Sequence, residues 1–497
     1  LIVAAIALHR HRYFPVLDLA MTEFRVRDVG GAHTPLIGLP GRIGKFPAQG
    51  SHPGPLSFYL LTPVYRLLGS SGWSLLVAAI SVNVAAFSTT VAMAFRKGGW
   101  RLAGVVALWL VLIIRGYGTS VLTQPWNPYL PLAAWTLVLL AAWMVADGDH
   151  AALVPLVVAG TLCAQTHVPY LVLCVGVFAV ATVVCVRRSG WAAMRTSFAW
   201  SVGAGVLLWL PPLVDQAIHA PGNISMLREH FTNTTEQPIG LGAGVRLLLR
   251  HLDIVSALTS RGGNGGFLAA ASEANRSLFV GALVLIVWVA CAVLSWRMRH
   301  RSLVALHTVL GSVLIFEALS MVRIFGKVWY YLTLWAWAVT VALVLAVVAT
   351  LWCWWSNRNV ARAQRANRWL LAGGCLVAVA CTAVSVSGAV SAQVPEHRLS
   401  EALGQLIEPT VAAVRQGVGA ATAGEKGTYL VTWTDALVFG SQGYGLVNDL
   451  ERAVALLEEL HGVLDRLGVA EQLPRLAQQF HDAGLGLLHG PTGDLGP

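Results

Sequence analysis

The sequence predicts an all-α polytopic membrane protein with about eleven transmembrane helices. Of its 497 residues, 56% are hydrophobic and only 12% are charged, whereas about 25% of residues are charged in typical soluble domains. The hydrophobic residues form blocks of roughly 17–25 residues, the length at which a helix crosses the bilayer core. A large soluble helical protein would instead show polar stripes at a period of 3.6 residues, and segments 277–294 and 369–390 have none.

Each apolar block is expected to form one membrane-spanning helix. The first block is short, and we expect the start of that span to precede Leu1. Many of the nineteen tryptophans stand near block ends, as in the aromatic belts at membrane–water interfaces. In chain order, the predicted spans cover residues 1–8, 73–95, 102–114, 129–146, 151–164, 169–186, 197–214, 277–296, 302–320, 328–351 and 369–389.

Positive charge is concentrated in alternate connections between these spans. Cytoplasmic connections of membrane proteins carry an excess of Lys and Arg, so we place the four basic connections in the cytoplasm. The other long connections and the tail then lie outside, which predicts a multi-pass cell-membrane protein with an extracytoplasmic active face. The basic connections are 96–101, 187–195, 297–301 and 358–368.

Two domains are expected, a transmembrane domain over residues 1–389 and an extracytoplasmic C-terminal domain over 390–497. The transmembrane domain contains two long external loops, 9–72 and 215–276. Within the first, the apolar stretch 55–68 is too short to span and is expected to lie as a helix in the interface. The tail has soluble composition and predicts a small α/β domain with a frayed end, formed by helix 398–416, strand 428–433 and helix 446–468.

Composition also argues against several classes of site. The net charge of +10 comes from arginines in short connections between spans, so it does not indicate nucleic-acid binding. All seven cysteines lie in or beside apolar blocks, which predicts neither a disulfide framework nor a cysteine metal site. The glycine-rich run 240–244 follows no predicted strand, so it does not indicate a dinucleotide-binding loop.

The first external loop carries a candidate catalytic acid. Asp18 lies about ten residues after the first span and is therefore expected close to the membrane surface. A shielded carboxylate there would have a raised pKa and could act as a general base. The alternative is a solvated carboxylate paired with Arg25 or Arg27, and the charge pattern leaves both interpretations open.

A second candidate is His52, which precedes the predicted interfacial helix. Pro53 and Pro55 restrict the backbone at the point where that helix would begin, and proline is favourable in a first helical turn. His52 would then be held near the interface and could donate a hydrogen bond to a phosphate or sugar oxygen. A purely structural hydrogen-bonded cap is the alternative.

Other polar and aromatic residues are expected at the same face. Trp126 and Asn127 occupy one short external turn and His167 another, and we assign them to substrate binding. Arg323 and Lys327 place two cations in an apolar external connection, where a lipid phosphate is the natural partner. Snorkelling of both side chains to lipid headgroups is the alternative.

These features resemble the GT-C membrane glycosyltransferases over nearly the whole chain. The similarity rests on an acidic residue early in the first external loop, followed by a His-Pro segment that leads into a surface helix. The superfamily includes protein mannosyltransferases, aminoarabinose transferases and actinobacterial arabinofuranosyl- and mannosyltransferases. Its paired Asp-Glu is absent at Asp18-Leu19, so Glu23 or Asp28 would be the acidic partner. Its His-Pro-Pro reads His52-Pro53-Gly54.

The resemblance implies a polyprenyl-phosphate sugar donor and therefore no nucleotide-binding fold. Asp18 would deprotonate the acceptor hydroxyl, which attacks the anomeric carbon in an inverting displacement. His52, Arg323 and Lys327 would stabilise the leaving phosphate. We expect membrane lipids and an envelope glycan, lipid or protein acceptor as partners, and no nucleic acid. No cofactor is expected; some relatives use a divalent metal, but no ligand cluster in the sequence requires one.

Two other classes of function compete with this interpretation. A transporter or lipid flippase is expected to show internal repeats and charges inside spans, and here Glu317 is the chief intramembrane charge. A non-catalytic envelope scaffold that works through its tail is the third class.

Overall fold

Helices form nearly all the regular structure of the chain, as expected where every backbone polar group in a bilayer must be satisfied internally. The structure, a computed structural model, describes residues 1–44, 50–233, 236–255, 277–416 and 443–452. The chain divides into two units, Leu1–Ser400 and Glu401–Pro497.

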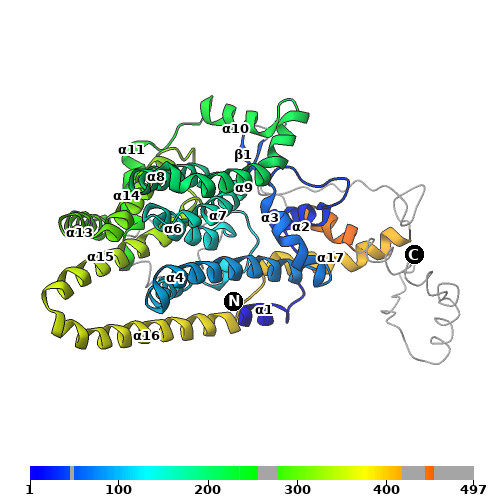
Figure 1. Cartoon of the computed structure of the whole chain (residues 1–497). Helices are drawn as coiled ribbons and strands as arrows, with labels where there is room; N and C mark the ends of the chain where they lie inside the picture. Colours follow the sequence, from blue (N-terminus) through cyan, green and yellow to red (C-terminus); the bar gives the residue numbers. More distant parts are fainter. Residues whose placement is uncertain (45–49, 234–235, 256–276, 417–442, 453–497) are drawn as a thin grey trace. The chain divides into compact units, whose positions relative to one another are not determined.

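The first unit is a bundle of long helices, with short helices and one β-hairpin in the connections between them (Figure 1). In chain order its elements are α1 (Ile2–Leu8), α2 (Leu17–Asp28), β1 (Pro40–Ile43), β2 (Gly50–Ser51), α3 (Leu56–Leu67), α4 (Gly72–Tyr117), α5 (Thr119–Leu122), α6 (Pro131–Ala146), η1 (His150–Ala152), α7 (Leu153–Thr166), α8 (Tyr170–Ser189), α9 (Trp191–Ile218), α10 (Asn223–Thr232), α11 (Gly240–His251), α13 (Leu278–Arg297), α14 (Arg301–Val322), η2 (Tyr330–Thr333), α15 (Ala336–Arg358), α16 (Val360–Val390) and the start of α17 (His397–Arg415).

The all-α polytopic architecture predicted from the sequence is confirmed. Among the described residues, seven helices are long and apolar enough to cross a membrane, and α6 and α7 are shorter apolar helices. Helix α4 is divided by a kink at Gly98 and Gly99, where Gly99 has a φ of +61°. Its two arms correspond to the predicted spans 73–95 and 102–114. The total of about eleven spans stays a prediction, because α1, α6 and α7 are short.

Burial distinguishes central from peripheral helices. Nearly every residue of α6 is buried, and a helix that is apolar on all sides belongs in the middle of a bundle. In contrast, α9 and α16 expose large apolar side chains such as Trp200, Leu207 and Leu376. Contiguous exposed apolar surface of this kind is expected where helices face lipid.

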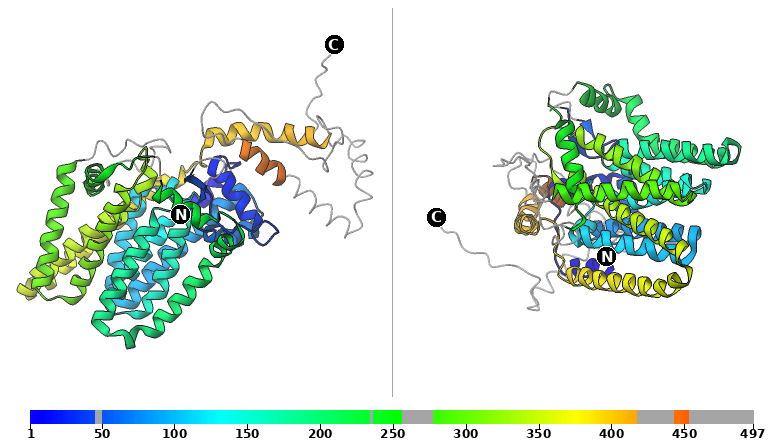
Figure 2. Two further views of the ribbon diagram at one scale, coloured as in Figure 1. Left: turned by 90° about the horizontal axis from the view of Figure 1, so that it is seen from above. Right: turned by 90° about the vertical axis from the view of Figure 1, so that its left-hand side faces the viewer.

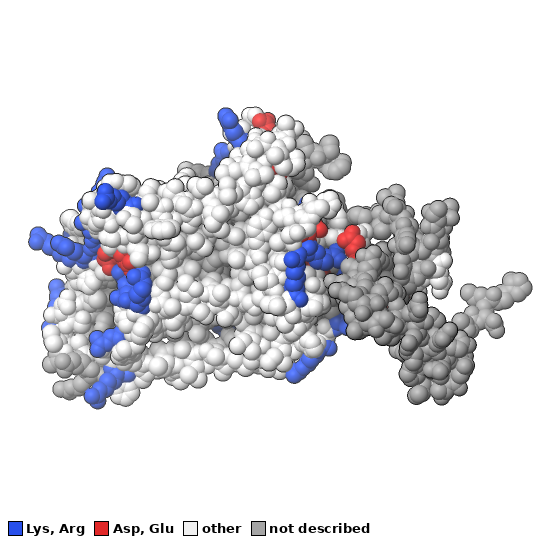
Figure 3. Space-filling view, turned by 45° about the vertical axis from the view of Figure 1, so that its right-hand side comes forward, with Lys and Arg blue, Asp and Glu red and all other residues white. Residues whose placement is uncertain are grey.

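The surface charge pattern agrees with this membrane-spanning arrangement. Figure 3 shows Lys and Arg gathered towards the two ends of the face in view, with a broad uncharged band between them. Such a band is the expected surface of helices in contact with hydrocarbon.

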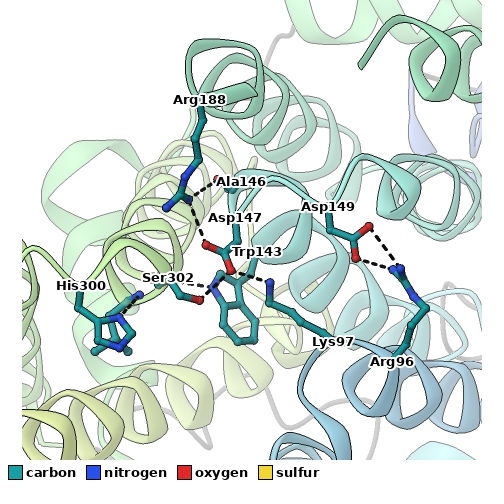
Figure 4. Close-up of polar contacts among 10 residues, drawn as sticks. Arg96, Lys97, Trp143, Ala146, Asp147, Asp149, Arg188, His300 and Ser302 are labelled. Atoms are coloured by element: carbon teal, nitrogen blue, oxygen red, sulfur yellow. Dashed lines mark hydrogen bonds and ion pairs between the residues drawn. The ribbon is translucent and has the colours of Figure 1, made fainter. Parts of the chain in front are cut away.

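Three of the four basic connections meet at one end of the bundle. Lys97 and Arg188 both bind the carboxylate of Asp147, with N–O distances of 2.6 and 3.1 Å. Ser302 Oγ donates to the same carboxylate at 2.9 Å (Figure 4). The clustering places three connections that the charge pattern assigns to the cytoplasm on the same side of the bundle.

The first external loop forms a small layer at one end of the bundle (Figures 1 and 2). Its strands β1 and β2 pair antiparallel, with Pro40 opposite Ser51 and Ile43 opposite Gly50. Helix α3 begins directly after Pro55, where the sequence predicts the interfacial helix, and buries Tyr65 against α4.

The second external loop contributes α10 and α11. The glycine-rich run 240–244, which is not expected to be a dinucleotide-binding loop, forms the first turn of α11. A Cβ atom at Gly244 would lie within 3.0 Å of Val322 in α14, so this glycine permits close packing of the two helices.

In the tail, α17 agrees with the helix predicted at 398–416, and residues 443–452 are helical. The predicted strand 428–433 and the later part of helix 446–468 lie outside the described residues. The connection after α16 belongs to the first unit, because Val394 packs with Leu8 and Tyr13, and Ser400 Oγ accepts a hydrogen bond from Phe14 N at 2.9 Å.

Candidate functional site

The backbone that carries His52 is fixed by Asn223, the first residue of α10. Asn223 Oδ1 accepts from Ser51 N at 2.8 Å, and its Nδ2 donates to the carbonyl oxygens of Ser51 and His52 at 3.1 and 3.3 Å. The backbone N–H of Asn223 donates to Asp215 Oδ2 at 2.9 Å. Asn223 is only 1% exposed, so these bonds satisfy an amide that would be costly to leave unpaired.

The contacts of Gly54 explain why position 54 is glycine rather than a second proline after Pro53. Its backbone N–H donates to the carbonyl of Gln165 at 3.2 Å, a bond that proline could not form. The Gln165 side chain also fills the position of a Cβ at residue 54, and its Oε1 accepts from Leu56 N at 3.3 Å. The segment after His52 is thereby seated on the end of α7.

His52 is buried and oriented as a hydrogen-bond donor. Its Nδ1 accepts from Val168 N at 3.3 Å, so the neutral ring carries its proton on Nε2. Burial lowers the pKa of His52 from 6.5 to about 4. Near neutral pH the imidazole is therefore uncharged and offers one N–H.

Asp18 lies in the first turn of α2 and has one strong hydrogen bond. Trp126 Nε1 donates to Asp18 Oδ2 at 2.7 Å. Burial raises the pKa of Asp18 above its usual range, and the bond from Trp126 opposes that rise. No described residue forms an ion pair with Asp18. The alternative interpretation, a carboxylate paired with Arg25 or Arg27, is therefore not supported. The preceding Leu17 has a φ of +58°, a strained conformation that is often found at functional sites.

A chain of aromatic contacts, here called the aromatic bridge, connects the surroundings of Asp18 with His52. Its members are Trp126, Tyr331 and His167. The ring centroids of Trp126 and Tyr331 are 4.9 Å apart, those of Tyr331 and His167 6.4 Å, and those of His167 and His52 5.3 Å. Residues from three connections that are distant in sequence therefore lie along one path, at the end of the bundle predicted to be external.

Lys327 joins this path, whereas Arg323 is directed elsewhere. Lys327 Nζ lies 4.3 Å from the centroid of Trp329, and the Trp329 ring stacks on Tyr331 at 6.4 Å with an interplanar angle of 13°. Arg323 Nη2 donates to the carbonyl of Phe231 in α10 at 2.7 Å. Both cations are exposed. Of the two, only Lys327 is connected to the aromatic bridge by ring contacts, through Trp329.

The remaining acidic candidates occupy different surroundings. Glu23 is fully buried and accepts a hydrogen bond from Tyr65 Oη at 2.7 Å, among side chains that join α2 to α3. Asp28 is the last residue of α2, more than two helical turns along the chain from Asp18. Neither is seen to contact the aromatic bridge.

Asn127 Oδ1 and His167 Nδ1 are among the buried polar atoms near the site that have no hydrogen-bond partner among the described residues. Burial lowers the pKa of His167 well below its usual range, and the neighbouring His52 lowers it further. Two neutral imidazoles therefore face one another. In the described part of the chain, no group of three or more His, Cys, Asp or Glu residues could hold a metal ion.

Tyr331, Trp329 and Asn223 were not identified from the sequence as parts of the site. Both aromatic residues stand a few positions after Lys327, within a span predicted to begin at 328. An aromatic residue at the outer end of a span is ordinarily assigned to the interfacial belt. The contacts of Tyr331 with Trp126 and His167, more than 150 positions away, leave no signal in a single sequence.

Comparison with known proteins gives one similarity to report. Neither a protein-family model nor a curated protein matches the chain. The crystal structure of ArnT from Cupriavidus metallidurans in the apo state is similar in chain path, with 15% sequence identity over 96% of this chain and 78% of that chain. The superposition has a TM-score of 0.40, so the function of this chain is inferred below from its own residues.

Proposed function

We propose that the chain is a membrane glycosyltransferase of the GT-C type. It would transfer a sugar from a polyprenyl-phosphate lipid to a cell-envelope glycan, lipid or protein acceptor on the extracytoplasmic face. The observation that carries this proposal is the placement of Asp18, His52 and Lys327 around one set of aromatic rings. This placement brings a base, a neutral N–H donor and a cation together at the end of the bundle opposite the basic connections.

The proposed reaction is a single inverting displacement. The acceptor hydroxyl loses its proton to Asp18, and its oxygen forms a bond to the anomeric carbon. The bond between that carbon and the phosphate oxygen breaks, and the electron pair leaves with the polyprenyl phosphate. Lys327 and the Nε2–H of His52 would stabilise the negative charge on the leaving group. No further reactant is needed.

The raised pKa of Asp18 supports its role as the base. A carboxylate of ordinary acidity would be a weak proton acceptor near neutral pH, whereas a base works best when its pKa lies near the operating pH. Desolvation of Asp18 moves its pKa in that direction. Glu23 would support α2 through Tyr65, and Arg323 would hold the connection to α10.

A transporter remains the second candidate because of Glu317. It is 1% exposed, and its Oε1 has no partner among the described residues. Transporter sites lie near the bilayer midplane, but Glu317 is only five residues from the end of α14, about 7.5 Å along a helix. That depth favours a role close to the outer surface.

Binding of polyprenyl phosphate to the purified protein in lipid nanodiscs tests the donor site. Lys327→Ala should weaken binding about tenfold, since a charge-assisted contact contributes on the order of 1.4 kcal/mol. Arg323→Ala should weaken it less, because that guanidinium already bonds to Phe231. Arg187→Ala, at the basic end, is the control and should bind as wild type. Equal affinities for Lys327→Ala and the control would leave Lys327 as a snorkelling side chain.

A further inference from the structure

We propose that Trp126 is a positioning residue for Asp18, and that Tyr331 and Tyr129 hold its indole ring in place. This role rests on the proposed function of Asp18 and differs from direct contact with substrate. It makes the aromatic bridge part of the machinery that orients the base.

The two carboxylate oxygens of Asp18 have different surroundings. Trp126 Nε1 donates to Oδ2 of Asp18 at 2.7 Å, and no described residue is seen to donate to Oδ1. A short charge-assisted bond orients the carboxylate. One oxygen is thereby fixed, and the other is left to accept the proton of an acceptor hydroxyl.

Two tyrosine rings pack against the indole ring of Trp126. Tyr129 contacts it edge-on, with centroids 4.7 Å apart, and Tyr331 contacts it at 4.9 Å. Edge-to-face pairs at such separations are favourable beyond the area that they bury. Trp126 is 7% exposed, so its N–H cannot turn away from Asp18 without moving both tyrosines.

Apolar side chains pack around Trp126. The buried side chains around Trp126 come from α1, α2, α4 and the connection after α16, and they are Leu8, Tyr13, Leu19, Leu76 and Val394. Tyr13, Tyr129 and Tyr331 are titratable members of this cluster, and Tyr330 and Glu396 interact with Tyr129. Among these described neighbours, Trp126 is the group seen to bond to the carboxylate.

The test follows the protonation of Asp18 by infrared spectroscopy and needs no substrate. The stretching band of the protonated carboxyl group is titrated in wild type and assigned by its loss in Asp18→Asn. In Trp126→Phe the titration midpoint should rise by roughly one to two pH units, because a bond that stabilises the carboxylate has been removed. Tyr331→Leu should move the midpoint in the same direction by a smaller amount.

Trp73→Phe is the matched control. Trp73 also donates its indole N–H at the outer end, to the carbonyl of Ala5 at 2.9 Å, so its loss should leave the Asp18 midpoint unchanged. An unchanged midpoint in both Trp126→Phe and Tyr331→Leu would overturn the positioning role. If Trp126→Phe does not fold, an unchanged Asp18 midpoint in Tyr331→Leu alone would overturn the positioning role.

A transfer assay separates this inference from the proposed function. If Asp18→Asn abolishes sugar transfer while the Asp18 midpoint is the same in wild type and Trp126→Phe, the function stands and the positioning role fails. If Asp18→Asn transfers at the wild-type rate while the midpoint shifts, Trp126 still orients Asp18, but Asp18 is not the base.

Discussion

Burial shifts the pKa values of Asp18 and His52 in opposite directions. It raises the pKa of Asp18 and lowers the pKa of His52, because in each case the charged form is disfavoured. The carboxylate becomes a better proton acceptor, and the imidazole remains a neutral donor. Both effects suit the proposed reaction, in which the site takes a proton from a hydroxyl and stabilises a leaving phosphate.

The pKa of His52 predicts how stability depends on pH. The unfolded imidazole titrates near 6.5 and the folded one near 4. Between these values the unfolded state binds more protons, so stability is lost as pH falls through this window, by on the order of 3 kcal/mol. His52→Gln should therefore flatten the pH dependence of the thermal unfolding midpoint between pH 6.5 and 4. The exposed His33→Gln serves as a control and should keep the wild-type slope. If both variants kept it, His52 would not be buried neutral.

At the residue scale, the sequence predicted individual members of the site but not how they are held. Asp18 and His52 could be singled out because an acid after a span and a histidine before a proline-flanked helix are local patterns. The bond from Trp126 to Asp18 joins residues 108 positions apart. The stacking of Trp329 on Tyr331 depends on the turn formed by η2. Neither contact has a periodicity or a motif from which it could be read.

At the element scale, helix ends at the basic face are joined by a shared carboxylate. Asp147, in the short turn after α6, receives Lys97 from the kink of α4 and Arg188 from the end of α8. These side chains are 15–25% exposed, so the ion pairs are partly shielded from water. The charge pattern predicts that the basic connections lie on one face, but it does not predict that Asp147 binds two of them.

This arrangement predicts unequal effects for two neighbouring aspartates. Asp147→Asn should lower the free energy of unfolding by about 1–3 kcal/mol, because two cations lose their carboxylate. Asp149→Asn should cost about 0–1 kcal/mol, because its partner Arg96 is largely exposed. Comparing thermal unfolding midpoints in one detergent checks this order (Figure 4). Equal midpoints for the two variants would show that the shared carboxylate does not stabilise the bundle.

At the scale of the whole molecule, the long apolar blocks were sufficient to predict the helices. Each long helix contains a block that hydropathy identifies, including the two arms of α4 on either side of Gly98 and Gly99. Hydropathy could not predict that α6 lies at the centre while α16 is exposed, because a long apolar block indicates a helix but not which neighbours cover it. That difference arises from packing between helices, as does the meeting of the external connections at the site.

The predicted orientation in the membrane can be tested by cysteine labelling. Arg228→Cys lies on α10 at the outer end, and Arg187→Cys lies at the basic end; both native side chains are exposed. A membrane-impermeant maleimide added to intact cells should modify Arg228→Cys at once and Arg187→Cys only after permeabilisation. The wild-type chain measures labelling of the native cysteines. The reverse pattern would invert the orientation and with it the assignment of the active face.

The central claim is that Asp18 is the base of a sugar transfer from a polyprenyl-phosphate donor, and the rate of that transfer tests it most directly. The assay presents radiolabelled polyprenyl-phosphate sugars to membranes that contain either wild type or Asp18→Asn, and follows incorporation into envelope material. General-base assistance contributes about 10²–10⁴-fold to a rate. Asp18→Asn should therefore lose transfer by roughly that factor while it retains polyprenyl-phosphate binding. Transfer at the wild-type rate by Asp18→Asn would contradict the account. If Glu23→Gln and Asp28→Asn also transferred at that rate, all three acidic candidates would be excluded as the base.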